Sequence, residues 1–166
     1  MDNLNANEDE LDSNIPEKLR KEIKERTKGN AHYTEVYRVA KWGIIEEKVF
    51  LSTYGELLAD ILPNDLEKYP MDEIGTYSTS VYTGREPCDK YISCLKRSKR
   101  LKKTYPYPVV IKGKTSKGCV ELTVNRDKEA DPEHIDWWIY DGKRSNVMQD
   151  FIISYRVQMI CFFLII

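Results

Sequence analysis

The stretch that decides the fold is His134–Tyr140, which reads HIDWWIY and is followed by the turn signal Asp141-Gly142. It is dominated by aromatic and β-branched residues, which is typical of a strand. Because side chains alternate along a strand, Ile135, Trp137 and Ile139 share one face, which is purely apolar and belongs in a core. The opposite face carries His134, Asp136, Trp138 and Tyr140. This second face is aromatic but holds a titratable pair, so it could line a pocket.

The rest of the chain alternates short strand patterns with helical segments. We expect strands at Val36–Trp42, around Val49–Leu51, and at Thr76–Tyr82, Val109–Ile111 and Cys119–Val124. We expect helices at residues 17–28 and 87–103, and a hairpin turn over Gly113–Gly118. These elements predict a single α+β domain with a mixed or antiparallel sheet of short strands and two or three helices.

Composition divides the chain into four parts. At 166 residues, with 41% hydrophobic and 32% charged residues, one domain is the default. We expect a disordered acidic tail at residues 1–14, an N-terminal helix at 15–30, an α+β core at 31–145 and an apolar tail at 146–166. Residues 157–166 are compatible with a final buried strand, a tail that touches a membrane or a partner, or a reading-frame accident that replaced the native end.

Cysteine and histidine usage excludes several classes of site. None of the four cysteines lies two or three residues from another, and the two histidines are about 100 residues apart, so we expect no metal site. The acidic start is no signal peptide and no segment is long enough to span a bilayer, which predicts reduced thiols and a cytoplasmic protein. Because Gly-rich phosphate loops, His-Glu-x-x-His and Gly-x-Ser-x-Gly are absent from the sequence, kinases, P-loop proteins and α/β-hydrolases are not expected.

Three expected strands carry Arg38, Ser78-Thr79-Ser80 and Glu121 in that order. This order resembles the Arg / Ser-Thr-Ser / Glu pattern of the ADP-ribosyltransferase fold. The resemblance implies that Arg38 holds the pyrophosphate of NAD, that Ser78–Ser80 shape the nicotinamide pocket, and that Glu121 stabilises an oxocarbenium-like ribose. Cys119 departs from the pattern, because the arginine- and asparagine-modifying branches have Glu or Gln at that position. The structural alternative has Arg38 reaching solvent from a sheet edge and Glu121 solvated.

The polar face of the central strand is a second candidate site. A carboxylate such as Asp136 can orient an imidazole such as His134 and tune its pKa for acid–base work. We expect His134, Asp136 and Trp138 to form a pocket wall beside bound NAD. In the structural alternative, the tryptophans belong to the core and its rim.

The third candidate is a basic segment at the end of the second expected helix. Its six cations are Lys96, Arg97, Lys99, Arg100, Lys102 and Lys103. They could contact a nucleic acid or an acidic protein partner, or form a solvated helix end. Two functions therefore stay open. One is an ADP-ribosyltransferase-like protein that binds NAD and transfers ADP-ribose to an unknown target. The other is a non-enzymatic accessory protein of a mobile element that binds a protein or nucleic acid through the helix at 87–103.

Overall fold

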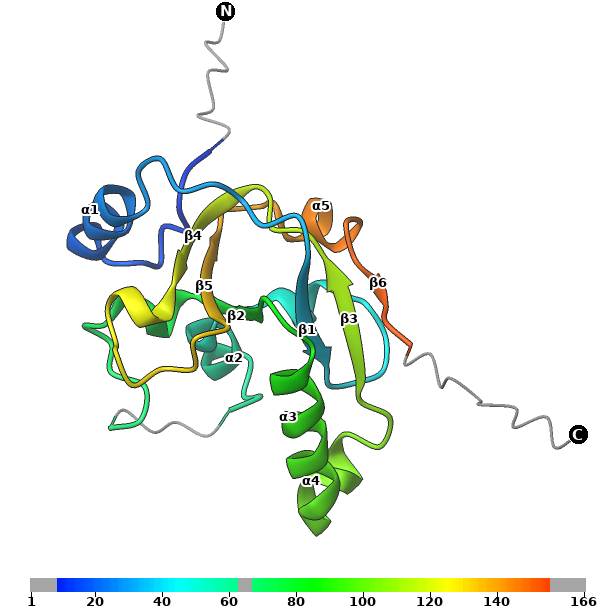
Figure 1. Ribbon diagram of the computed structural model, residues 1–166. Helices are drawn as coiled ribbons and strands as arrows, with labels where there is room; N and C mark the ends of the chain where they lie inside the picture. Colours follow the sequence, from blue (N-terminus) through cyan, green and yellow to red (C-terminus); the bar gives the residue numbers. More distant parts are fainter. Residues whose placement is uncertain (1–8, 63–66, 156–166) are drawn as a thin grey trace, which may run out of the picture.

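A computed structural model of the chain describes residues 9–62 and 67–155. Within these residues, six strands form one antiparallel sheet in the order β4-β5-β2-β1-β3-β6 (Figure 1). In chain order the strands are β1 Val36–Ala40, β2 Thr79–Tyr82, β3 Val109–Gly113, β4 Gly118–Leu122, β5 His134–Ile139 and β6 Ile152–Ile153. The expected α+β class with a sheet of short strands is confirmed, but the described residues contain five α-helices where two or three were expected.

Short helices surround the sheet. The α-helices in the described part of the chain are α1 Glu17–Arg26, α2 Thr53–Leu58, α3 Glu86–Arg97, α4 Lys99–Thr104 and α5 Arg144–Met148. Single 3-10 turns lie at η1 Glu47–Phe50, η2 Ile74–Tyr77 and η3 Thr123–Asn125. No helix of residues 9–62 and 67–155 has the length and apolar character needed to cross a bilayer.

The main core covers one face of the sheet. Ile135, Trp137 and Ile139 lie in it, as the alternation along the central strand predicts. Phe50 enters this core from η1, and its ring meets the ring of Trp137 edge to face at a centroid distance of 6.4 Å. Burial of these large apolar side chains is the main favourable term for the fold.

The opposite face of the sheet is divided into two apolar clusters. One cluster joins Leu19 and Ile23 of α1 to Trp138 on β5. The other joins Leu95 of α3 to Val39 on β1 and further residues of β3 and α4. Between them, the same face of β2, β5 and β4 carries the polar side chains of Ser80, Asp136 and Glu121, which lie opposite one another on adjacent strands. Several of the candidate site residues are therefore on this polar part of the sheet.

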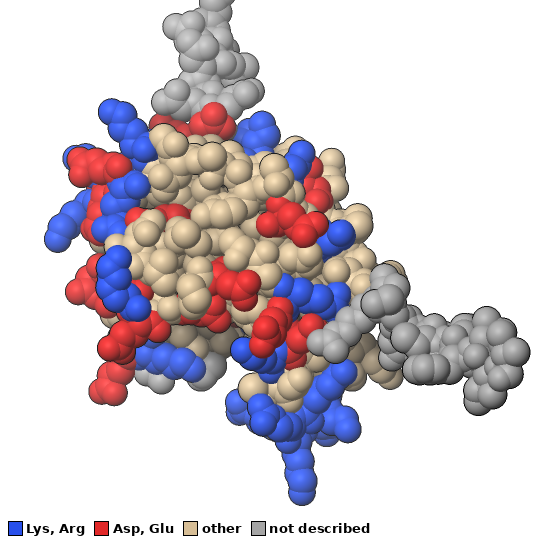
Figure 2. Space-filling view, in the orientation of Figure 1, with Lys and Arg blue, Asp and Glu red and all other residues tan. Residues whose placement is uncertain are grey.

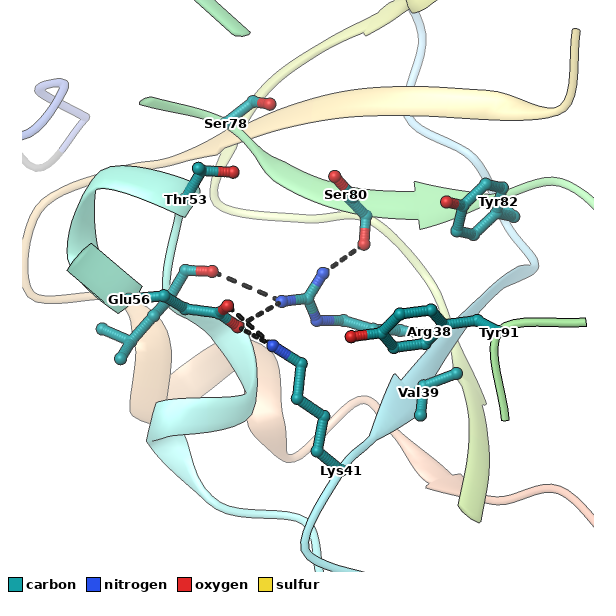
Figure 3. A pocket seen from close by; sticks show the side chains of 10 residues that line it. Arg38, Val39, Lys41, Thr53, Glu56, Ser78, Ser80, Tyr82 and Tyr91 are labelled. Atoms are coloured by element: carbon teal, nitrogen blue, oxygen red, sulfur yellow. Dashed lines mark hydrogen bonds and ion pairs between the residues drawn. The ribbon is translucent and has the colours of Figure 1, made fainter. Parts of the chain in front are cut away.

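The sheet is weakly paired in its middle, at a seam between β1 and β2. Within the described residues, these strands are in register only at Tyr37 and Tyr82. By contrast, β1 pairs with β3 at five positions and β2 pairs with β5 at four. The chains of β1 and β2 therefore separate beyond Tyr37, and the side chain of Arg38 lies in the gap between them (Figure 3).

The predicted hairpin over Gly113–Gly118 is wrong, because β3 and β4 are not neighbours in the sheet. The connection instead runs across the end of the sheet, where the Thr115 hydroxyl accepts a hydrogen bond of 2.8 Å from the backbone N–H of Tyr33. Gly118 then pairs with Ile139 on β5. A Cβ at Gly118 would lie 2.3 Å from the carbonyl oxygen of Trp138, so glycine is required by close strand contact and not by a turn.

Other predicted elements differ in detail, and the strands expected over Val36–Trp42 and Cys119–Val124 end at Ala40 and Leu122. Instead of the strand expected around Val49–Leu51, the chain forms the 3-10 turn η1. This turn buries the side chains of Val49 and Phe50. The strand expected from Thr76 begins only at Thr79, after a second 3-10 turn. The helix expected over 87–103 is two helices, because Ser98 has an extended backbone and its hydroxyl accepts from the N–H of Leu101, which caps α4.

The ordered fold starts earlier than predicted. Leu11 is 2% exposed and forms an isolated β-bridge with Tyr140, so the disorder expected for residues 1–14 does not hold for residues 9–14. The apolar cluster on α1 needs Leu11 as a neighbour, which explains why this short segment is ordered. At the other end, Ile152 and Ile153 form β6 against β3. The predictions for residues 1–8 and for residues 157–166 lie outside the described residues.

Candidate functional site: the Arg38 pocket

A pocket of about 210 Å³ opens at the seam between β1 and β2, and we call it the Arg38 pocket (Figure 3). Strands β1 and β2 form one side, α2 and the segment before it form the other, and α3 contributes one tyrosine. Its lining residues are Arg38, Val39, Lys41, Leu51, Thr53, Glu56, Ser78, Ser80, Tyr82 and Tyr91. The pocket therefore lies at the meeting point of segments that are far apart in the sequence.

Arg38 bridges the gap between the separating strands. Its guanidinium donates to the backbone carbonyl of Ser80 on β2 and to that of Leu51 at 3.3 Å. Its Nε donates to the carbonyl of Val49 at 2.5 Å. The side chain is only 12% exposed, so these carbonyls would lack partners without it. The expectation that Arg38 reaches solvent from a sheet edge is therefore wrong.

Lys41 and Glu56 form an ion pair in the wall of the pocket. The Lys41 Nζ lies 2.9 Å from Oε1 and 2.7 Å from Oε2 of Glu56, and both residues are buried. The nearest guanidinium nitrogen of Arg38 lies 3.9 Å from the same carboxylate. A single carboxylate thus faces two cations, as Figure 3 shows.

This arrangement leaves the pocket with an excess of positive charge. Burial lowers the pKa of both Arg38 and Lys41, and the Glu56 carboxylate opposes the shift in each case. Arginine does not lose its proton in proteins. The three charged groups therefore sum to one positive charge, in surroundings where water screens charge poorly.

Several hydroxyl groups on the pocket wall are free to bind a ligand. The hydroxyls of Thr53, Ser80, Tyr82 and Tyr91 make no hydrogen bond to any described residue. The Ser78 hydroxyl is different, because it donates to the Asp136 carboxylate at 2.6 Å. The wall therefore offers neutral donors and acceptors around its two cations.

The structure brings together part of the predicted cofactor set. Arg38, Ser78 and Ser80 line the same pocket. Thr79 does not, because alternation along β2 turns it toward the opposite face, where its hydroxyl donates to the carbonyl of Phe50 at 3.0 Å. Trp138 is 1% exposed in the α1 cluster and donates its indole N–H to the carbonyl of Ile74, so it does not line the pocket either.

Glu121 lies on the same face of the sheet but outside the Arg38 pocket. It is opposite Asp136, which in turn is opposite Ser80, so two inter-strand spacings separate Glu121 from the pocket wall. Its carboxylate receives two hydrogen bonds of 3.0 Å from Arg26 on α1. Glu121 is 5% exposed, so the expectation that it is solvated is wrong.

His134 and Asp136 are linked indirectly. The Thr123 hydroxyl lies 2.8 Å from Nδ1 of His134 and donates to Asp136 at 3.1 Å. Asp136 is 1% exposed and also accepts from Arg126 at 2.8 Å and from Ser78. With three partners, the Asp136 carboxylate is satisfied, and it holds the Ser78 hydroxyl in place at the edge of the pocket.

Sequence reasoning missed Lys41 and Glu56. The available signal for Lys41 was a lysine between Ala40 and Trp42 on a strand that is otherwise half apolar. For Glu56 it was a carboxylate inside the short helix at Thr53–Leu58. Neither signal predicts that Lys41 and Glu56 form an ion pair. The pair depends on how α2 packs against the end of β1.

No family model, curated protein or solved structure matches this chain.

Proposed function

We propose that this chain binds a phosphorylated small molecule of the NAD type in the Arg38 pocket. The observation that carries the proposal is the charge balance of the wall, where Arg38 and Lys41 face a single carboxylate, Glu56. A phosphate would restore neutrality there, and a guanidinium is well suited to bind phosphate oxygens through paired N–H groups. The free hydroxyls of Thr53 and Ser80 provide further polar contacts.

The size of the pocket limits how much of the ligand it encloses. Its volume of about 210 Å³ is below the range of roughly 300–1,000 Å³ that is common for ligand sites. One phosphate-bearing part of a dinucleotide would enter, and the rest would lie outside. Tyr91, which is 42% exposed, offers an aromatic surface on which a ring of the ligand can stack.

The proposal concerns binding rather than transfer. The resemblance to ADP-ribosyltransferases implies that Glu121 stabilises the ribose, but the Glu121 carboxylate is held by Arg26 and does not line the pocket. Glu56 is the carboxylate in the wall, and Lys41 neutralises it. ADP-ribose transfer therefore stays a prediction from the resemblance.

The test is calorimetric titration with NAD and, separately, with inorganic pyrophosphate. We expect NAD to bind in the micromolar to low-millimolar range and Arg38→Gln to weaken binding at least about tenfold, because it removes a charge-assisted contact. Arg100→Gln is the matched control, since it removes the charge of an exposed arginine outside the pocket that forms no ion pair with a described residue. Its affinity for NAD should stay within about threefold of wild type.

A second variant guards against misfolding of Arg38→Gln. Thr53→Phe narrows the pocket without removing a charge, and Thr53 is not part of the core. It should abolish NAD binding while its circular dichroism spectrum matches that of wild type. No binding of NAD or pyrophosphate to the wild type, or equal loss in Arg100→Gln, would overturn the proposal. Binding of pyrophosphate but not NAD would keep the anion site and reject NAD as its ligand.

A further inference from the structure

The charges of this chain are strongly segregated. Between Asp89 and Glu121 the sequence holds ten Lys and Arg residues and no Asp or Glu. The whole chain has a net charge of −1, so the residues outside this segment carry −11. A nearly neutral protein therefore has one strongly positive region, and the net charge alone conceals it.

Six of these cations gather at the end of the α3–α4 projection. We call residues 96–103 the basic tip; its cations are Lys96, Arg97, Lys99, Arg100, Lys102 and Lys103. Figure 1 shows α3 and α4 extending away from the sheet, and Figure 2 shows Lys and Arg side chains without acidic ones at that end. All six residues are exposed, and none forms an ion pair with another described residue.

The basic tip is anchored firmly to the domain. Leu95 is 2% exposed in the cluster under α3, and Leu101 packs against the same cluster from α4. After α4, the ring of Tyr105 meets the ring of Trp42 at a centroid distance of 5.5 Å. The break at Ser98 turns α4 relative to α3, so the cations project from two helices. The six cations are therefore attached to helices that pack firmly on the domain. Substituting the cations leaves the buried contacts of Leu95, Leu101 and Tyr105 unchanged.

The chemistry around the cations indicates the kind of partner. An interfacial membrane helix needs an exposed apolar face beside its cations. Protein interfaces usually have an apolar centre. The basic tip has neither, since residues 96–103 include no exposed large apolar side chain and the exposed Tyr107 beyond α4 is a single ring rather than an apolar face. A projecting helix of about 10–12 Å diameter with unpaired cations instead fits a groove bordered by phosphates.

We propose that the basic tip binds the sugar–phosphate backbone of a nucleic acid, independently of base sequence and of the Arg38 pocket. Lysine and arginine side chains that neutralise phosphates release bound counterions, which provides most of the affinity of such binding. The side chains of the tip contact phosphates rather than base edges in this proposal. The site would therefore recognise the charge and shape of the nucleic-acid backbone.

Fluorescence anisotropy with labelled duplex DNA, single-stranded DNA and duplex RNA of mixed sequence tests this proposal. The test variant is Lys96→Gln/Lys99→Gln/Lys102→Gln/Lys103→Gln. The matched control is Lys18→Gln/Lys21→Gln/Lys24→Gln/Lys28→Gln, which removes the same charge from exposed lysines on and next to α1. On α1 these lysines alternate with glutamates, as the mixed colours around α1 in Figure 2 show.

We expect the wild type to bind at least one of the three probes with a Kd below about 100 μM at low salt. The tip variant should lose at least about tenfold in affinity, and the slope of log K against log salt should become shallower by about 3 to 4, because each phosphate contact contributes about 0.9. The α1 control should stay within about threefold of wild type. The affinities for the three probes show whether the tip prefers DNA or RNA and duplex or single strand.

Three results would overturn the proposal. They are absence of binding to all three probes at about 50 mM salt, equal losses in the tip and α1 variants, and binding only to anionic vesicles or to a poly-glutamate peptide. The two proposals are separable, because Arg38→Gln should retain nucleic-acid binding and the tip variant should retain NAD binding. Failure of one measurement leaves the other unaffected.

Discussion

The molecule has two groups of cations in opposite surroundings. Arg38 and Lys41 in the pocket are largely buried, whereas the six cations of the basic tip are exposed to water. The two pocket cations are largely withdrawn from water and bonded to carbonyls or to Glu56, so the fold depends on them. The tip cations are exposed and form no ion pair with a described residue, and among them Arg97 donates to the Sγ of Cys94, so the fold depends little on them. The same residue types can thus act as structural groups in one region and as free binding groups in another, and composition cannot distinguish the two.

The largest expected effect separates these two groups by stability. Arg38→Met removes the donor to the carbonyls of Val49, Leu51 and Ser80 and should lower the free energy of unfolding by about 3–5 kcal/mol. Lys99→Met in the basic tip should change it by less than about 0.5 kcal/mol. Urea unfolding of both variants checks the difference, and similar values for the two would contradict the comparison.

A smaller effect concerns the ion pair in the pocket wall. Lys41→Met leaves the Glu56 carboxylate buried with only Arg38 at 3.9 Å, and it should cost about 2–4 kcal/mol. Replacing both partners, as Lys41→Met/Glu56→Leu, should cost less than the sum of the single changes. The double-mutant cycle is measured by urea unfolding. An additive result would show that the pair is not coupled.

His134 is also largely buried, but unlike Arg38 its side chain can lose its proton near neutral pH. Burial lowers the pKa of His134, with Asp136 opposing this shift and Arg126 supporting it. The unfolded chain therefore binds a proton at higher pH than the folded chain, so stability should fall as pH drops through about 6.5 and level off below the folded pKa. Unfolding measurements between about pH 8 and pH 5 should show this component in wild type and not in His134→Gln. An identical pH dependence in both proteins would refute it.

The smallest effect is expected at the basic tip itself. The six neighbouring cations repel one another, so the four-lysine tip variant should gain a few tenths of a kcal/mol at low salt. The gain should disappear at high salt, because screening removes the repulsion. Thermal unfolding at two salt concentrations measures it, with the four-lysine α1 variant as control. A loss of stability at low salt would mean that the tip lysines make contacts on which the fold depends.

The sequence predicts best what depends on local periodicity. Alternation along His134–Ile139 correctly assigns Ile135, Trp137 and Ile139 to the core. The alternation pattern fails where a strand and a 3-10 turn would bury the same side chains. Val49 and Phe50 are such a case, because they enter the core from a 3-10 turn. It also fails at Ser98, which can continue a helix or cap the next one.

The candidate site is harder to predict, because its contacts join distant segments. The sequence places Arg38, Ser78 and Ser80 on strands, and they line one pocket. It cannot show that Arg26, 95 residues earlier, pairs with Glu121, or that α2 brings Glu56 to Lys41. The strand order β4-β5-β2-β1-β3-β6 decides both outcomes. The order follows from packing across the whole sheet, and no single stretch of sequence specifies it.

The single register position between β1 and β2 has a mechanical consequence. It divides the sheet into a half made of β4, β5 and β2 and a half made of β1, β3 and β6, joined by Tyr37, Tyr82 and the side chain of Arg38. Under load or in spontaneous opening, this line should part before any well-paired strand, and backbone amides along it should exchange their hydrogens early. A molecule bound in the Arg38 pocket would contact Arg38 of one half and Ser80 of the other, so its binding should slow the separation of the two halves.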